Sequence, residues 1–247
     1  MTPHPDPRGQ GERPAGEIRI IPLTGLPELR QGDDLAALLG DAIERVAGGL
    51  EPGDVLVVAQ KAVSKIEGRV ARVPVGDHVG AVLAEARAVR RRRDDFLIVE
   101  TSHGFVCASA GIDRSNAPGD DWVVLLPEDP DASARRLREG LLARFGCAPG
   151  VIVSDSFGRA WRQGTTDVAI GVAGIVPLLD LRGQRDARGR ELQGTVICIA
   201  DELAGAAELA TGKARRVPAA LVRGYEAPAG EGLATDVIMP RERDLFP

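Results

Sequence analysis

The chain has 247 residues, which is long enough to bury a hydrophobic core and argues against a small domain held together by disulfides. Its 31 lysine and arginine residues against 36 aspartate and glutamate residues give a net charge of −5, so we expect no nucleic-acid partner. The basic residues are almost all arginine, and the chain contains few lysines and asparagines: Lys61, Lys65, Lys213 and Asn116. In a chain with this bias, those positions have extra weight as functional candidates.

The first residues are rich in proline and glycine and lack the apolar centre of a signal peptide. We predict a disordered segment over residues 1–16 and a single domain over residues 17–247. The longest apolar stretch, residues 168–179, is too short to cross a bilayer, so we expect no membrane segment and a cytoplasmic protein. The spacing of the cysteines and histidines predicts three buried free thiols and no structural zinc site.

In the first half of the chain, hydrophobic periodicity and helix-end signals predict two helices and three strands. The arginine run at residues 90–93 is interpreted as the solvated end of the second helix. The predicted elements are a strand over 18–25, a helix over 35–50 that follows Asp33 and Asp34, a buried strand over 55–60, a helix over 79–93 and a strand over 96–101.

The second half continues with strands and helices that do not alternate strictly, which favours an α+β fold over a doubly wound α/β fold. A charged turn is expected over residues 181–192. The predicted strands cover 104–111, 122–127, 151–155, 195–200 and 219–225, the predicted helices cover 131–146 and 201–212, and polar loops cover 111–121 and 156–167.

Several of these loops and strand ends carry groups that suit phosphate or a divalent cation. If the strand over 55–60 runs into a helix, Lys61 and Lys65 lie one turn apart on one face, where they either bind phosphate oxygens or form a solvated surface pair. Asp113, with Ser115 and Asn116, is explained either by a turn or by a binding loop.

Carboxylates also follow two later strands. Asp155 and Ser156 follow a buried strand and precede Arg159 and Arg162, a combination that suits a hard divalent cation and an anionic substrate. Asp201 and Glu202 open a helix, where acidic residues also serve as caps. If these strand ends meet at one edge of a sheet, their oxygens would bind magnesium or manganese together with a phosphorylated substrate.

The familiar nucleotide-binding motifs are absent: the chain has no G-x-G-x-x-G, and TGKA at 211–214 lacks the spacing of a P-loop. Instead, a succession of unusual segments closely resembles the coenzyme F420-0:γ-glutamyl ligase family from residue 18 to residue 225. These segments are IPLTGLPE, VVAQKAVSKIEG, HGFVCASAGIDRSN, LLPEDPDASA, VSDSFGRAWRQGTTDVAIGVAGIVPLLDLRG and IADELAGAAELATG.

The resemblance implies a stand-alone ligase domain that uses GTP to join L-glutamate to coenzyme F420-0 and then extends a γ-linked glutamate tail. It implies Mg²⁺ or Mn²⁺, two ions at each site, with K⁺ as a further ion. The implied fold is an α+β arrangement of intertwined, mainly antiparallel sheets flanked by helices, and the implied assembly is a homodimer.

The resemblance also assigns residues. Asp113 and Asp155 would hold one metal ion, and Ser156 together with a carboxylate of the Asp201 and Glu202 pair, taken as Glu202, would hold the second. Charge neutralisation would fall to Lys65, Arg159 and Arg162. The nucleotide would contact Leu23, Thr24, Gly25, Leu26, Gln60, Lys65 and Asn116.

Two positions depart from the family pattern, since Gln60 replaces a serine or other small polar residue of some relatives and Ser156 replaces a common threonine. Both keep a hydrogen-bonding oxygen. The implied reaction forms an acyl phosphate on the acceptor carboxylate, and the amine of glutamate then attacks the acyl carbon and displaces phosphate. Two alternatives are a related ligase acting on another carboxylate acceptor and a non-catalytic module that binds GTP or metal.

Overall fold

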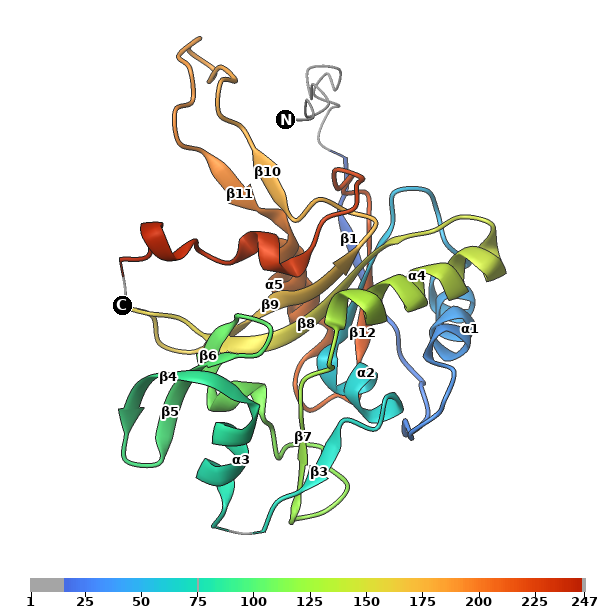
Figure 1. Ribbon diagram of the computed structural model, residues 1–247. Helices are drawn as coiled ribbons and strands as arrows, with labels where there is room; N and C mark the ends of the chain where they lie inside the picture. Colours follow the sequence, from blue (N-terminus) through green and yellow to red (C-terminus); the bar gives the residue numbers. More distant parts are fainter. Residues whose placement is uncertain (1–15, 75, 246–247) are drawn as a thin grey trace.

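The computed structural model describes residues 16–74 and 76–245, and all but the last residue of the predicted disordered segment lies outside this range. The central element is a mixed five-stranded sheet (Figure 1). Its neighbouring strands are antiparallel except for the parallel pair β2 and β8. In spatial order the strands are β1 (Arg19–Pro22), β12 (Ala219–Arg223), β2 (Val55–Ala59), β8 (Gly150–Gly158) and β9 (Thr165–Ala173).

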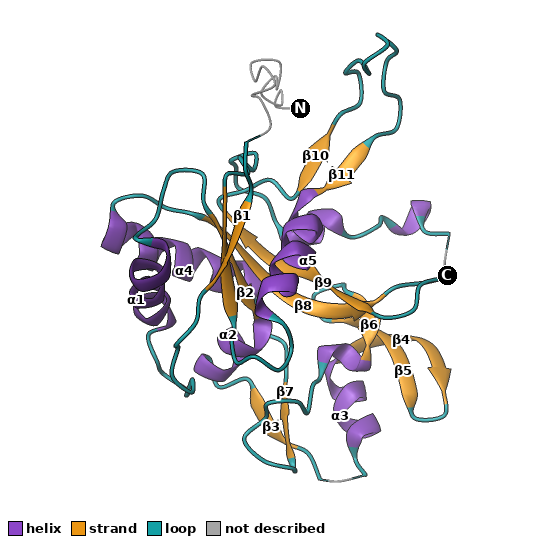
Figure 2. Cartoon of the chain, turned by 180° about the vertical axis from the view of Figure 1, so that it is seen from behind, coloured by secondary structure: helices purple, strands orange, loops and turns teal. Residues whose placement is uncertain are grey.

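Helices cover both faces of this sheet, as Figure 2 shows. Alternate residues of the strands point to opposite faces, so Leu56 and Val58 pack on one side and Val55 and Val57 on the other. The first face is covered by α1 (Leu35–Ala47), α2 (Gln60–Ile66) and α4 (Pro130–Phe145), and the second by α5 (Ile199–Thr211).

Smaller sheets surround this centre. A third apolar cluster joins β5 (Phe96–Thr101) to α3 (His78–Glu85) and to the 3-10 turn η1 (Ser109–Gly111). A two-stranded arm projects away from the rest of the chain in Figures 1 and 2. The remaining elements are the sheet β4 (Ala86–Arg93), β5 (Phe96–Thr101), β6 (Val106–Ala108), the pair β3 (Val70–Arg72) and β7 (Trp122–Val124), the arm β10 (Leu178–Asp180) and β11 (Val196–Cys198), α3 (His78–Glu85), η2 (Ala234–Val237) and η3 (Arg241–Arg243).

The predicted α+β class is confirmed, and the first helix begins at Leu35 as predicted and ends at Ala47. The carboxylate of Asp34 accepts a hydrogen bond from the Ala37 N–H at 2.9 Å, and Gly48 ends the helix at a φ of 73°. None of the helices in the described part of the chain is both long and apolar enough to cross a membrane.

The predicted helix over 79–93 is wrong in its second half. Helix α3 ends at Glu85, and residues 86–93 form β4, which pairs with β5. The two strands are joined by a two-residue turn in which Asp94 has a φ of 54°, a conformation that aspartate tolerates better than most residues. Cross-strand pairing therefore overrides the helix propensity of the arginines.

Two further predictions need correction. The loop expected over 156–167 is mostly a hairpin, because β8 continues to Gly158 and β9 begins at Thr165. The three cysteines are free, but only Cys107 is buried, while Cys147 in the turn after α4 and Cys198 at the start of α5 are half-buried. The strands expected over 104–111 and 122–127 are also shorter than predicted.

Candidate functional site

Lys61 and two of the predicted metal ligands form a polar cluster at the start of α2. The ammonium of Lys61 lies 2.5 Å from a carboxylate oxygen of Asp113 and also contacts the hydroxyl of Ser115. The backbone N–H of Ser115 donates to Asp113 at 2.6 Å. Asp155 is near enough for Lys61 to act on its charge. The structure therefore brings Asp113 and Asp155 to the same side of the sheet, with Lys61 acting on both.

The two carboxylates of this cluster have opposite pKa shifts. Burial alone would raise the pKa of Asp113, but the hydrogen bonds from Lys61 and from the Ser115 N–H bring it below its ordinary value. Burial raises the pKa of Asp155 to about 7, and the negative charge of Asp167 acts in the same direction. A cation placed beside Asp155 would favour its charged form, so the electrostatics of this cluster fit a divalent metal ion.

The donor set limits how such an ion would be held. In the part of the chain that the structure describes, no group of three or more histidine, cysteine, aspartate or glutamate side chains could hold a metal ion. Two carboxylates suit Mg²⁺ or Mn²⁺ only if waters or substrate phosphates complete the ligand shell. The pair Asp113 and Asp155 therefore fits an ion that arrives with a phosphorylated substrate.

Ser156 belongs to a second polar cluster on the opposite face of β8, because successive strand residues point to opposite sides. Its hydroxyl donates to Asp167 at 2.5 Å, and the hydroxyl of Ser154 donates to the other oxygen of that carboxylate at 3.0 Å. Lys213 lies 3.1 Å from Asp167 and 3.3 Å from Glu208. The sequence marked Lys213 only by its rarity, and the structure gives it these two carboxylate partners.

Glu202 lies in the first turn of α5, where its charge contributes to the raised pKa values of Cys198 and Tyr225. The neighbouring Asp201 accepts a hydrogen bond from the Ala169 N–H at 2.9 Å and so fixes α5 against β9. Among the described residues, no hydrogen bond or ion pair joins Glu202 to the other predicted metal ligands.

The predicted nucleotide-binding turn follows β1. Leu23 is buried and Gly25 has a φ of 76°, which glycine adopts without strain. The guanidinium of Arg45 donates to the carbonyl oxygen of Thr24, so this turn is held against α1. Leu26 is partly buried and packs against the hydrophobic cluster on the α1 side of the central sheet.

The other predicted nucleotide contacts are on α2 and on the loop after η1. Gln60 is 1% exposed, and while its carbonyl oxygen accepts from Ser64 at 2.9 Å, its amide nitrogen has no hydrogen-bond partner among the described residues. An unpaired buried donor is costly unless a ligand or water satisfies it. Lys65 pairs with Glu28 at 2.6 Å, and Asn116 is exposed at a φ of 58°.

Arg159 and Arg162 lie in the exposed turn of the β8–β9 hairpin, where the Arg162 N–H donates to the Arg159 carbonyl at 3.3 Å. In the described parts of the chain, no ion pair neutralises either side chain. Both positive charges are therefore available to an anionic substrate at this hairpin.

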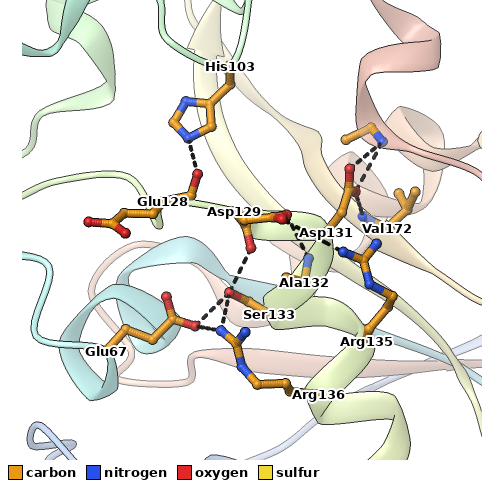
Figure 3. A network of polar contacts seen from close by, with 11 residues as sticks. Glu67, His103, Glu128, Asp129, Asp131, Ala132, Ser133, Arg135, Arg136 and Val172 are labelled. Carbon is orange, nitrogen blue, oxygen red and sulfur yellow. Dashed lines mark hydrogen bonds and ion pairs between the residues drawn. The ribbon is translucent and has the colours of Figure 1, made fainter.

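A surface cleft of about 380 Å³ lies elsewhere, and none of the predicted site residues lines it. Figure 3 shows Glu67 and Arg136 of this cleft pointing toward one another. Ser133 donates to Glu67 at 2.6 Å, and Arg136 lies 2.5 Å from the same carboxylate. Because these charges are already paired, we place the candidate site at Asp113 and Asp155 and not in this cleft.

Comparison with known proteins identifies relatives along most of the chain. The family described as F420-0:Gamma-glutamyl ligase matches residues 25–224. The chain is similar to coenzyme F420:L-glutamate ligase of Methanothermobacter thermautotrophicus, with 39% identity over 93% of this chain and 98% of the relative. It is 40% identical to the protein of the same name from Methanopyrus kandleri, over 93% and 97% of the two chains, and 38% identical to that of Methanocaldococcus jannaschii, over 80% and 86%.

Proposed function

Because this chain belongs to the F420-0:γ-glutamyl ligase family, we propose that it is a GTP-dependent ligase that adds L-glutamate to coenzyme F420-0 and extends the γ-linked tail. The observation that carries the proposal is the cluster of Asp113, Asp155 and Lys61, in a chain whose relatives are named coenzyme F420:L-glutamate ligase. We further propose a homodimer, with K⁺ as an additional ion.

In the proposed reaction, a carboxylate oxygen of the acceptor attacks the γ-phosphorus of GTP, and the bond to the β-phosphate oxygen breaks to release GDP. The amine of glutamate then attacks the carbonyl carbon of the acyl phosphate. Inorganic phosphate leaves, the nitrogen loses a proton, and an amide is formed.

The residues of the chain hold and neutralise the reacting groups in this scheme. Asp113 and Asp155 would hold one Mg²⁺ or Mn²⁺, which supplies positive charge to the phosphates when bound. Ser156 and Glu202 are the proposed ligands of a second ion, since Ser156 keeps its oxygen lone pairs while it donates to Asp167. Lys65 and the hairpin arginines Arg159 and Arg162 would neutralise negative charge as it develops.

The nucleotide would bind between the turn at residues 23–26 and the start of α2. Gln60 has a buried amide N–H group without a partner, which a nucleotide could satisfy. Asn116, exposed on the loop after η1, is the third proposed contact.

Turnover is tested by mixing the protein with GTP, Mn²⁺, glutamate and coenzyme F420-0 and measuring product mass and GDP. The proposal expects GDP release only when both glutamate and the acceptor are present. GTP binding without amide formation would contradict it, and turnover with a different carboxylate alone would identify a ligase with another acceptor.

The Asp155→Asn variant tests the metal assignment. Loss of one carboxylate charge should lower kcat/KM by about 100-fold or more, because electrostatic stabilisation of the reacting phosphates is worth several kcal/mol. The matched control is Asp180→Asn, which removes an exposed carboxylate on the β10–β11 arm that pairs with Arg182. Near-normal turnover by Asp155→Asn, with circular dichroism unchanged in both variants, would contradict the assignment.

A further inference from the structure

Three arginines surround one buried carboxylate in the sheet formed by β4, β5 and β6. Glu100 of β5 is 5% exposed. Arg90 of β4 contacts one of its oxygens, Arg87 of β4 lies 3.5 Å from the other, and Arg241 of η3 approaches within 3.2 Å. We call Arg87, Arg90 and Arg241 the arginine cluster.

The arginine cluster carries more positive charge than its carboxylate partner can balance. In the described part of the chain, none of the three arginines forms an ion pair with any carboxylate other than Glu100. Three guanidinium groups and one carboxylate leave an excess of two positive charges, in a protein whose net charge is −5. The side chains of Arg87 and Arg241 are 64% and 72% exposed, so the excess charge faces solvent.

The arginine cluster lies near the candidate site. β6 pairs with β5 so that Val106 is opposite Glu100. The next residue is Cys107, and it lies close enough to Asp155 for the charge of that carboxylate to raise the pKa of the Cys107 thiol. β4 is two strand spacings from β6, or about 10 Å, and Glu100 and Cys107 point to opposite faces of this sheet. In Figures 1 and 2, the tip of the β8–β9 hairpin and the C-terminal segment are drawn on the same side as this sheet.

The product of the proposed reaction has the matching chemistry. Each γ-linked glutamate uses its side-chain carboxylate in an amide and keeps its α-carboxylate free, so the tail gains one negative charge per residue. Each residue adds five backbone bonds of about 1.5 Å, or roughly 6 Å when extended. A tail of two or three residues would therefore extend roughly 12 to 18 Å from the acceptor. The planar fork of arginine suits carboxylates in particular.

We propose that the arginine cluster binds the α-carboxylates of the growing γ-glutamyl tail and so favours acceptors that already carry glutamate. This inference rests on the proposed ligase function. It assigns a role to the arginines of β4, which the proposed reaction itself does not use.

The test is the double variant Arg87→Gln and Arg241→Gln, which keeps the pair between Arg90 and Glu100. Its KM should be unchanged for the acceptor without glutamate and should rise about fivefold for the acceptor with two glutamates, since two exposed ion pairs are lost. The matched control is Arg72→Gln, which removes an arginine that is also 72% exposed but pairs one to one with Asp121. An equal effect on both acceptors, or none on either, would overturn the proposal.

A binding measurement separates this inference from the ligase proposal. Tri-γ-glutamate is titrated into the unmodified protein and into both variants, and binding is followed by calorimetry. If the unmodified protein forms no amide but binds this peptide, and the double variant binds it more weakly, the ligase proposal fails and the tail site stands. If the peptide binds all three proteins equally, or binds none, the tail site is overturned. Tighter binding of a single-stranded oligonucleotide than of the peptide would also overturn it.

Discussion

Burial alone would raise the pKa of both Glu100 and Asp155, but only at Glu100 do nearby cations outweigh this effect. Burial alone would raise the pKa of Glu100, yet Arg90, Arg241 and Arg87 together lower it. Burial raises the pKa of Asp155 to about 7, and the negative charge of Asp167 acts in the same direction. Glu100 is therefore stable as an anion, whereas Asp155 requires a nearby cation to be fully charged at neutral pH.

The lowered pKa of Glu100 predicts how stability depends on pH. Its contribution to the free energy of unfolding is fully present above the unfolded pKa of 4.5 and is lost as pH falls through the lower pKa of the folded state. The Glu100→Gln variant should therefore be less stable than the unmodified protein near pH 6.5, and the difference should shrink on acidification to about pH 3.5. Urea unfolding at both pH values measures this difference.

The same measurement on Glu242→Gln is the control, since this glutamate is exposed. If the Glu100→Gln difference is equally large at both pH values, the arginines do not act on the charge of Glu100.

At the scale of elements, the contact between α4 and β9 depends on the absence of one side chain. A Cβ at Gly171 of β9 would lie 2.4 Å from the carbonyl oxygen of Pro130, the first residue of α4. The next residue on each element adds a hydrogen bond, since the Val172 N–H donates to Asp131 at 2.7 Å. Asp131 also accepts from the Ala234 N–H at 3.1 Å, so the start of α4 joins β9 to η2.

Gly171→Ala should destabilise the protein by about 1–3 kcal/mol, because the added methyl group meets backbone atoms that cannot turn away. Gly158→Ala is the control, since a Cβ at that position would meet nothing within 4 Å. Chemical denaturation of both variants measures the difference. Equal midpoints would mean that the start of α4 moves from β9 at little cost.

The elements also show where sequence patterns succeed and fail. The strand over 55–60 and the helix that begins after Asp34 follow from an apolar run and a cap, which are local signals. The helix predicted over 79–93 is wrong in its second half because pairing with β5 determines the conformation of residues 86–93. The sequence of the arginine run alone does not show that pairing. The adjacent aspartates at 94 and 95 were the local signal for a hairpin.

The candidate site was predictable to a similar degree. Asp113, Asp155 and the pair Asp201 and Glu202 were expected at one sheet edge because each follows a strand, and Lys61 acts on the first two carboxylates. That Ser156 points to the other face could not be inferred, because residues 156–167 were interpreted as a loop, and only a strand assigns alternate sides. The partners of Lys213 come from β9 and α5, which no local pattern connects.

At the scale of the whole molecule, one buried ion pair joins parts that are far apart in the sequence. Arg223 of β12 donates to both oxygens of Asp54 at 3.0 and 2.8 Å. The same guanidinium donates to the carbonyl oxygens of Ala47 and Gly49 at the end of α1. Asp54 is 2% exposed and also accepts a hydrogen bond from the Glu51 N–H at 2.8 Å, but its cationic partner is Arg223.

Arg223→Ala should therefore destabilise the protein by about 3–5 kcal/mol, because it leaves a buried carboxylate unpaired. The double variant Asp54→Ala and Arg223→Ala should be more stable than the sum of the two single variants predicts. Urea denaturation of all three variants and of the unmodified protein gives the free energies of unfolding for this double-mutant cycle. A loss below about 1 kcal/mol for Arg223→Ala would mean that water reaches Asp54.

The order of strands in the central sheet has a consequence for how the protein is made. β12 lies between β1 and β2, although some 160 residues separate it from β2 in the sequence, as the contact between Arg223 and Asp54 illustrates. During synthesis, β1 and β2 leave the ribosome early and have no strand between them until residues 219–223 emerge. Both then expose hydrogen-bonding edges, and such edges promote aggregation. We therefore expect the sheet to close only when translation is almost finished, which makes the nascent chain dependent on other factors for protection.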